Sequence, residues 1–287
     1  LAVLQARRLL DGESGAAEAV REEAARTGEK RRRLLTEAGF PADYLELRYD
    51  CPLCRDKGLV DGQKCRCFRQ KELELLYRQS QIRERLKTEN FDSCTLCCYS
   101  EEELVEGTGQ TVRRYMQGVI EDCRRFAADF GTSGGNLIFY GGTGVGKTFL
   151  AGCIARELIE AYYSVIYLSA GDLFDLLAKE RFRREEDEGA QEAQSVLDCE
   201  LLIVDELGTE LCNSWTNSQL FACLNERLLN KKSTIITTNL SPSRLGREYS
   251  ERIGSRFIEN FRFVFIPGMD IRIWKQREQR KKHRGEK

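Results

Sequence analysis

A glycine-rich segment near the middle of the chain has the residue types and spacing that bind phosphate. Residues 141–148 read GGTGVGKT and match the pattern GxxxxGK followed by Ser or Thr. Such glycines let successive backbone N–H groups turn toward an anion, while Lys147 can reach the β- and γ-phosphates and the Thr148 hydroxyl can ligate Mg²⁺. The alternative is a glycine-rich turn before a helix, but residues 136–140 are strand-like and residues 149–162 have helical apolar spacing. We therefore predict a nucleoside triphosphate site, whose cofactor-binding residues are Gly141, Gly142, Thr143, Gly144, Val145, Gly146, Lys147 and Thr148.

Two adjacent carboxylates end an apolar run further along the chain. Residues 200–206 read ELLIVDE, and four consecutive apolar residues predict a strand buried on both faces. Carboxylates at the carboxyl end of such a strand lie where parallel α/β sheets bind their ligands. We therefore predict that Asp205 holds Mg²⁺ together with Thr148, and that Glu206 activates the attacking water.

Three more polar residues could complete a hydrolytic site. Asn239 ends the predicted strand 233–238, where it can orient water against the γ-phosphate, although an Asn that only forms a turn is the alternative. Arg252 and Arg256 lie four residues apart on one face of a short predicted helix. A surface arginine pair is the ordinary interpretation, and a charge-neutralising finger inserted into a neighbouring subunit's ATP site is the functional one.

Four cysteines ahead of this region have the spacing of a metal site. A CxxC pair is followed by a short glycine-containing hairpin at residues 57–62 and then by a CxC pair. Two such pairs on neighbouring turns can converge on one ion, and four thiolates in a tetrahedron suit Zn²⁺. A redox CxxC and free buried thiols are the alternatives, but no thioredoxin-like strand and helix surround the motif. We predict that the zinc ligands are Cys51, Cys54, Cys65 and Cys67.

The elements that must position these residues alternate as in a parallel α/β fold. Strands are expected at residues 136–140, 164–168, 200–206, 233–238 and 261–266, and helices at residues 101–130, 149–162, 169–181 and 216–230. Two or three short helices are expected before residue 47, with breaks at residues 11–12 and 39–41, and a further helix at residues 69–90. We therefore predict a small helical and zinc-binding domain at residues 1–88, followed by an ATPase domain at residues 89–287 with a basic tail.

The composition is that of a chain with a substantial core and almost no net charge. The 287 residues are 41% hydrophobic, and 45 Lys or Arg against 46 Asp or Glu give a net charge of −1. Any contact with nucleic acid must therefore come from a local patch. Because no run of about 18 apolar residues is present, we expect no membrane contact and a cytoplasmic location. In that reducing compartment clustered cysteines more often hold metal than form disulfides.

With these motifs identified, the chain resembles the DnaC/DnaI-type replicative helicase loaders and the similar IstB-like transposition ATPases, both of the AAA+ class. The resemblance covers about residues 90–272 and rests on GGTGVGKT, LLIVDELGTE, NSQLFACLNERLLNKKSTIITTNLS, ERIGSRF and GMDIR. It implies a P-loop AAA+ sheet flanked by helices. It also implies catalytic roles for Lys147, Asp205, Glu206, Asn239 as sensor 1, and Arg256 as the arginine finger with Arg252 as its alternate.

The resemblance also implies a function and partners. Members load a replicative hexameric DNA helicase, act on single-stranded DNA as ATP-dependent homo-oligomers, and use ATP with Mg²⁺. The cysteine segment is similar to the zinc-bearing, helicase-binding domain of the DnaI-type branch, although its Cys-only spacing departs from the family member whose site includes a His. Two alternatives stay open: an IstB-like ATPase helper of a transposase, and a nucleotide-gated adaptor with little turnover.

Overall fold

The structure is a computed structural model that describes residues 16–45, 47–76, 88–181 and 188–285. The chain divides into two units, residues 1–56 and 57–287. The predicted domain boundary at residues 88–89 adjoins residues 77–87, which lie outside the described part of the chain.

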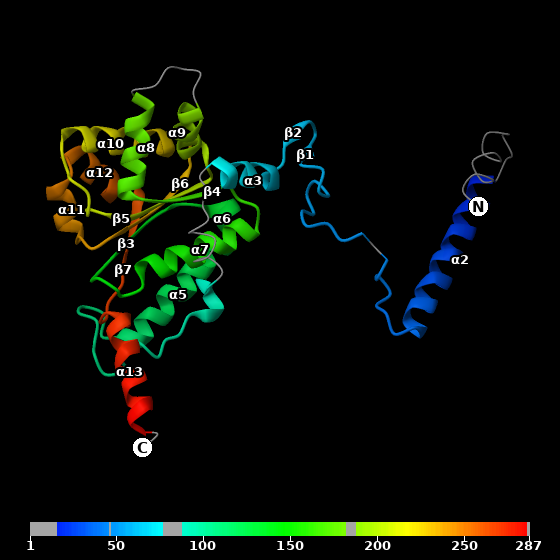
Figure 1. Ribbon diagram of the computed structural model, residues 1–287, viewed down its shortest axis with the longest axis horizontal. Helices are drawn as coiled ribbons and strands as arrows, with labels where there is room; N and C mark the ends of the chain where they lie inside the picture. The colour runs from blue at the N-terminus through cyan, green and yellow to red at the C-terminus, as the bar shows by residue number, and fades with distance from the viewer. Residues whose placement is uncertain (1–15, 46, 77–87, 182–187, 286–287) are drawn as a thin grey trace. The chain divides into compact units, whose positions relative to one another are not determined.

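The first unit contains helix α2 (Ala16–Glu37), drawn in blue in Figure 1. The helix ends before Gly39, which has a left-handed φ of +80°, and the N–H of Phe40 donates to the carbonyl of Leu35 at 2.9 Å. Glycine is favoured where a helix ends in this way, so the predicted break at residues 39–41 is confirmed. The 22 residues of α2 lie between the two predicted breaks, and the predicted helix before residues 11–12 falls outside the described residues.

The second unit begins with a hairpin and a helix. Strands β1 (Leu59–Val60) and β2 (Gln63–Lys64) pair in the antiparallel sense across Asp61 and Gly62, both at positive φ. A two-residue Asp-Gly turn is the connection that such tight hairpins prefer, and the predicted hairpin is confirmed. Helix α3 (Arg66–Leu76) follows. It begins three residues before the predicted helix at residues 69–90, and residues 77–87 of that prediction lie outside the described residues.

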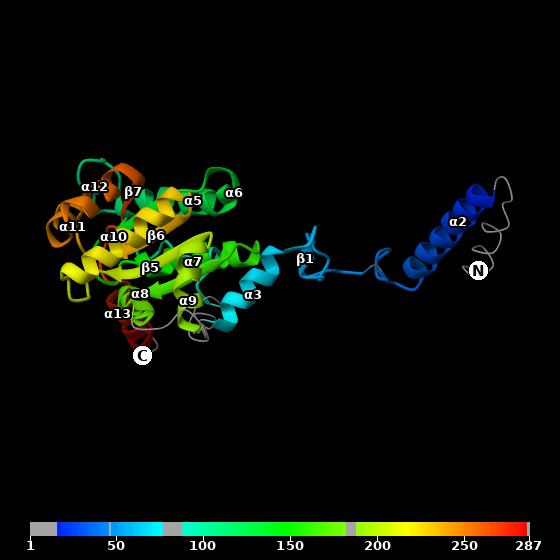
Figure 2. The same cartoon turned by 90° about the horizontal axis from the view of Figure 1, so that it is seen from above.

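A five-stranded sheet, in which every neighbouring pair is parallel, forms the centre of this unit. Its strands are β3 (Asn136–Tyr140), β4 (Val165–Ser169), β5 (Leu201–Leu207), β6 (Ser233–Thr238) and β7 (Phe261–Phe265). They lie in the order β4-β5-β6-β3-β7 (Figures 1 and 2). The predicted α/β fold is confirmed, and each predicted strand agrees with the structure to within one residue at either end.

Helices cover both faces of the sheet. In β3, Leu137 and Phe139 pack on the face that carries α5 (Val112–Ala128) and α7 (Lys147–Glu160), whereas Ile138 packs on the opposite face. The opposite face carries α8 (Ala170–Arg181), α9 (Glu188–Asp198), α10 (Ser214–Leu229), α11 (Pro242–Glu248) and α12 (Glu251–Asn260). Burial on both faces explains why the strands read as nearly continuous apolar runs.

The predicted helix at residues 101–130 is wrong at its start. Helix α5 begins only at Val112, after Thr111, whose side chain accepts a hydrogen bond from the N–H of Arg114. Before it, Leu104 and Thr111 form an isolated antiparallel bridge. A threonine in an extended conformation satisfies free N–H groups at a helix start, so the chain remains in turns until that cap.

The remaining elements are short or terminal. They are the 3₁₀ helix η1 (Phe91–Ser93), helix α6 (Phe130–Ser133) and helix α13 (Ile271–Gly285), drawn in red at the C-terminal end in Figure 1. The basic tail is therefore helical through residue 285. Within the described residues, no helix has both the length and the apolar character needed to cross a membrane.

Candidate functional site

The glycine-rich loop connects the carboxyl end of β3 to the first residue of α7. Gly146, immediately before the helix, has a φ of +109°, which glycine adopts without the penalty of a side chain. At Gly141 a Cβ would collide with the carbonyl oxygen of Ile266 at the end of β7, so the close approach of that segment requires glycine. The first N–H groups of a helix have no partner within the helix and lie at its positive end. The loop therefore presents N–H donors that favour an anion.

Lys147 is anchored at this end of the sheet by three acceptors. Its side chain is buried, and Nζ donates to the carbonyls of Gly141 at 3.0 Å and Gly142 at 2.5 Å, and to Oδ1 of Asn239 at 2.7 Å. Burial lowers the pKa of Lys147, and the nearby carboxylates of β5 offset only part of that shift. A triphosphate beside Nζ would favour the charged amine and raise this pKa again.

Asp205 and Thr148, the predicted Mg²⁺ ligands, are in direct contact. The hydroxyl of Thr148 donates to Oδ1 of Asp205 at 3.0 Å, and the hydroxyl of Thr237 donates to the same oxygen at 2.5 Å. Mg²⁺ takes oxygen ligands of this kind, so the pair fits the ion. Thr237 was not predicted. It is one of four hydroxyl residues in a fully buried strand, so its type alone gives no signal in the sequence.

Glu206 differs sharply from its neighbour Asp205. It is exposed, whereas Asp205 is buried, and its φ of +61° is uncommon for a residue with a side chain. The pairing of β5 with β6 shifts register between Val204 and Leu207, and the N–H of Glu206 donates to the hydroxyl of Thr237 at 2.9 Å. This irregularity directs the Glu206 carboxylate to solvent beside the buried Asp205. The two carboxylates are thus placed in different environments, as different roles require.

Arg252 and Arg256 both lie on α12, away from the loop in sequence. Nη2 of Arg256 donates to Oδ1 of Asn225 at 3.1 Å, and its guanidinium lies 6.0 Å from the ring centre of Phe221. Glu259, three residues later, is 3.7 Å from Nη1. Arg252 is exposed. Arg256 thus interacts with residues of α10 and α12. None of these interactions of Arg256 involves Lys147.

The four predicted zinc ligands converge. The Sγ atoms of Cys51, Cys54, Cys65 and Cys67 lie within 4.8 Å of one another. Hydrogen bonds from backbone N–H groups shape both turns: the N–H of Cys51 donates to the side-chain Oδ1 of Asp56 at 2.9 Å, and the N–H of Cys65 donates to the carbonyl of Gly58 at 2.8 Å. Four convergent sulfur donors are the set that Zn²⁺ prefers in structural sites, so the segment fits a zinc ion.

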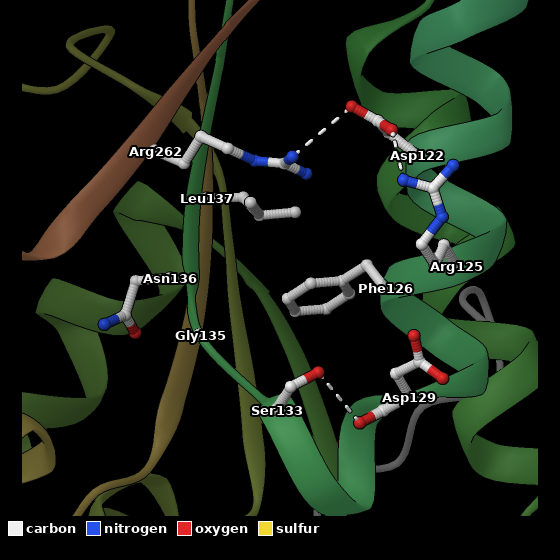
Figure 3. Close-up of a pocket in the computed structure, with 9 residues that line it drawn as sticks. All are labelled: Asp122, Arg125, Phe126, Asp129, Ser133, Gly135, Asn136, Leu137 and Arg262. Atoms are coloured by element: carbon white, nitrogen blue, oxygen red, sulfur yellow. Dashed lines mark hydrogen bonds and ion pairs between the residues drawn. The ribbon is translucent and has the colours of Figure 1, made fainter.

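A separate cavity lies at the other end of the sheet. It has a volume of about 250 Å³ and is lined by residues at the start of β3 and by α5. Figure 3 shows Asp122 on α5 between two arginines, with Arg262 at 3.3 Å and Arg125 at 3.2 Å. Both arginines that line the cavity are thus paired with Asp122. The phosphate-binding loop follows the carboxyl end of β3, so this cavity is not part of the nucleotide site.

The sequence of this site matches a known family. Residues 117–252 match the model of the family described as IstB-like ATP binding protein. This region, just under half of the 287 residues, is thus similar to an IstB-like ATP-binding domain. The matched region contains the loop, both carboxylates of β5 and Asn239, and it ends at Arg252, before Arg256.

Proteins similar to this chain include a phage-like element protein and two helicase loaders. It is 27% identical to the phage-like element PBSX protein XkdC of Bacillus subtilis, over 77% of this chain and 83% of that protein. It is 24% identical to the replicative helicase loader DnaI of Bacillus subtilis, over 73% of this chain and 71% of DnaI. With the replicative helicase loader DnaC of Escherichia coli it shares 24% identity over 55% of this chain and 62% of DnaC, which is less than two thirds of that relative.

A solved structure supports the fold. The crystal structure of the DnaC helicase loader superposes with a TM-score of 0.52 and 23% identity, over 64% of this chain and 99% of that chain. At this identity the likeness shows the fold alone. Together with the strand order, it identifies the second unit as a P-loop AAA+ sheet flanked by helices.

Proposed function

We propose that this chain is an ATPase that loads the replicative DNA helicase. The observation that carries the ATPase is the convergence of Lys147, Asp205 and Asn239 at one end of the sheet, in a domain matched to an ATP-binding family. Likeness to DnaC and DnaI, both named replicative helicase loaders, supports the helicase as partner. In this proposal the chain also binds single-stranded DNA, residues 1–88 hold the helicase, and residues 89–287 form the ATPase.

The chemistry is divided among the ends of three strands. Lys147 and the N–H groups of the loop hold the triphosphate. Thr148 and Asp205 would hold Mg²⁺, which supplies positive charge against the β- and γ-phosphates when bound. The exposed carboxylate of Glu206 accepts a hydrogen bond from the attacking water, and the amide of Asn239 orients that water against the γ-phosphate.

Arg256 would complete the site of a neighbouring subunit in an ATP-dependent homo-oligomer, with Arg252 as the alternate. Asn225 restrains the Arg256 guanidinium, and a side chain that is already restrained loses less entropy when it enters a second site. A positive charge placed there offsets the negative charge that develops on the γ-phosphate.

Mixing two variants tests the finger in trans. Glu206→Gln subunits keep the finger but lack the water-activating carboxylate, and Arg256→Ala subunits keep the site but lack the finger. Each alone should be inactive, and an equal mixture should recover ATP hydrolysis. Arg247→Ala, which changes an exposed arginine on α11, should be active alone. A mixture that stays inactive contradicts a finger supplied in trans by Arg256, and the same mixture with Arg252→Ala examines the alternate.

The Glu206→Gln variant also distinguishes an enzyme from a nucleotide-gated adaptor. An ATPase should lose turnover by orders of magnitude while ATP binding persists, because the substitution removes a group that acts in the transition state. An adaptor should have a negligible rate in the wild type and no change in the variant. Single-turnover hydrolysis and equilibrium ATP binding measure the two quantities separately.

The cysteine cluster would form the helicase-binding surface once a zinc ion has folded the segment. Such a small segment gains most of its folding free energy from the ion. We expect the replicative helicase of the host to co-purify with the wild-type chain in ATP and Mg²⁺, and Cys65→Ser to lose both the zinc mass and the complex. Cys212→Ser changes an exposed cysteine outside the cluster and is the control. If wild type and control capture no helicase, the helper of a transposase becomes the better function, which the IstB-like match favours.

A further inference from the structure

Helix α13 is the most strongly charged element among the described residues. Seven of its fifteen residues are basic and one is acidic; the basic residues are Arg272, Lys275, Arg277, Arg280, Lys281, Lys282 and Arg284. Arg272, Lys275, Arg277 and Arg280 are exposed, and no described carboxylate lies within 4.0 Å of their charged nitrogens. Their charge is thus available to an external anion, in a protein whose overall net charge is only −1.

The first turn of α13 is attached directly to the phosphate-binding loop. The N–H of Ile271 donates to the carbonyl of Gly144 at 3.0 Å. At Gly144 a Cβ would collide with the carboxylate of Asp270, which also accepts a hydrogen bond from the N–H of Arg272 at 2.9 Å. Ile271 and Trp274 pack against the core beside α5 and α7. The start of the basic helix is therefore fixed to the loop, while the rest of the helix extends beyond the core (Figure 1).

We propose that α13 binds the phosphate backbone of a nucleic acid strand, and that a triphosphate in the loop changes this affinity through the contacts of Gly144 with Asp270 and Ile271. The inference rests on the proposed nucleotide site. It names α13 as the surface that binds DNA and the bound nucleotide as the ligand that regulates this binding. Fifteen helical residues span roughly 22 Å, over which several phosphates of a strand lie within reach of the cations.

The composition of α13 favours a polyanion over a membrane. Residues 275–285 contain no large apolar side chain. A helix that lies on a bilayer needs an apolar face to bury, and this helix has none beyond its first turn. Phosphates of a nucleic acid need only charge and hydrogen-bond donors, which Arg and Lys supply.

The coupling follows from the position of Gly144 within the loop. Its carbonyl is held by Ile271, and the N–H groups that follow it are those that turn toward a bound phosphate. A rearrangement of the loop around a ligand is therefore transmitted to the first turn of α13. Because such coupling is reciprocal, nucleic acid on α13 must change the affinity for ATP by the same factor.

Salt-dependent binding tests the surface. Anisotropy of a labelled single-stranded DNA of mixed sequence is titrated with the full chain at several salt concentrations. Arg277→Gln with Arg280→Gln should weaken binding and make the slope of log K against log salt shallower by about 1.4, at about 0.7 per lost contact with a single strand. Arg244→Gln with Arg247→Gln removes two exposed arginines at the same spacing on α11 and should leave the slope unchanged. The proposed surface is overturned if both pairs act alike, if neither changes the slope, or if the wild type does not bind at low salt.

A second measurement tests the coupling. In the wild type, a non-hydrolysable ATP analogue should change the DNA affinity by roughly fivefold or more, and DNA should change the analogue's affinity equally. Asp270→Ala should bring this factor close to one, whereas Asp270→Asn, which can still cap the helix, should retain it. A factor of one in the wild type, despite tight binding of both ligands, overturns the coupling. A wild type that binds DNA but no nucleotide refutes the nucleotide site of the proposed function, and the slope measurement still decides whether α13 is the surface.

Discussion

Replacing the buried Arg227 of α10 by Met should strongly destabilise the unit that carries the ATP-binding domain. Arg227 is 0% exposed. It donates to the carbonyls of Val196 at 2.5 Å, Cys199 at 3.1 Å and Ser233 at 2.5 Å, and to the hydroxyl of Thr234 at 3.1 Å. Val196 and Cys199 lie at the end of α9, directly before β5, where free carbonyls and the negative end of the helix favour a cation. Arg227 thus joins α9 to the starts of β5 and β6.

The magnitude follows from the acceptors that Met would leave without a donor. Met replaces the aliphatic part of the Arg side chain but offers no N–H group, so four buried oxygens lose this partner. Each unsatisfied buried acceptor costs about 1–3 kcal/mol, and the lower end of that range gives a total of about 4 kcal/mol. Removal of one partner from a buried charged network costs a similar about 3–5 kcal/mol. Domain stabilities are about 5–15 kcal/mol, so the loss should be a large part of the total.

Urea unfolding followed by tryptophan fluorescence measures this loss. Both tryptophans, Trp215 and Trp274, belong to the second unit, so the signal does not depend on the first. With a slope of about 2 kcal/mol per molar urea, the midpoint should fall by about 2 M. Arg247→Met, at an exposed position, should leave it nearly unchanged. A fall of less than about 0.5 M for Arg227→Met would refute the reasoning, because the carbonyls would then find other partners at little cost.

Three further predictions concern the sites. ATP affinity should fall as the pH rises past the lowered pKa of Lys147, because phosphate favours the charged amine and binding must then take up a proton. Calorimetry in buffers of different ionisation enthalpy detects that proton uptake, and Lys147→Met should abolish the uptake. A strong chelator should unfold residues 51–67 and leave tryptophan fluorescence and ATP binding unchanged. If the chelator also changed the fluorescence and abolished ATP binding, a local role for zinc would be contradicted. Tyr249→Phe should cost about 1–3 kcal/mol in urea unfolding, because it removes a buried hydroxyl that donates to the Glu210 carboxylate, and an unchanged midpoint would disprove that contact.

The parts of the site that could be predicted from the sequence are those in which chemistry fixes both residue type and spacing. A loop that wraps a phosphate needs glycines at set positions and a lysine at the helix start. The residue types at positions 141–148 therefore predict the backbone conformation of the loop. Asp205 was predictable because a carboxylate at the end of a strand of buried apolar residues has few other uses. The convergence of the cysteine pairs was predictable because a short hairpin between two close pairs brings four sulfurs together, as a metal site needs.

The remaining parts depend on contacts between residues distant in the chain. Thr237 reads as an ordinary strand residue, and its role beside Asp205 exists only because β5 and β6 pair. Arg227 reads as the solvated residue of an amphipathic helix, because charged side chains are almost never fully buried unless partnered. Its partners at residues 196–199 and 233–234 become neighbours only in the folded sheet. The start of α5 was missed because apolar residues such as Val105 continue a helical pattern into a segment that Thr111 ends by capping.

Strand order explains why Asn239 and Thr237 belong to the site at all. If the strands lay in chain order, β6 would be separated from β3 by β4 and β5, and Asn239 would be far from Lys147. In the structure β6 lies between β3 and β5, so its end contacts the loop lysine through Asn239 and the buried carboxylate through Thr237. A ligand that displaces Lys147 from Asn239 and occupies Asp205 therefore acts on β6 from both sides. Strand β6 continues into α11 and α12, which carries Arg252 and Arg256, so the strand that contacts the nucleotide site also leads to the arginines proposed to serve the next one.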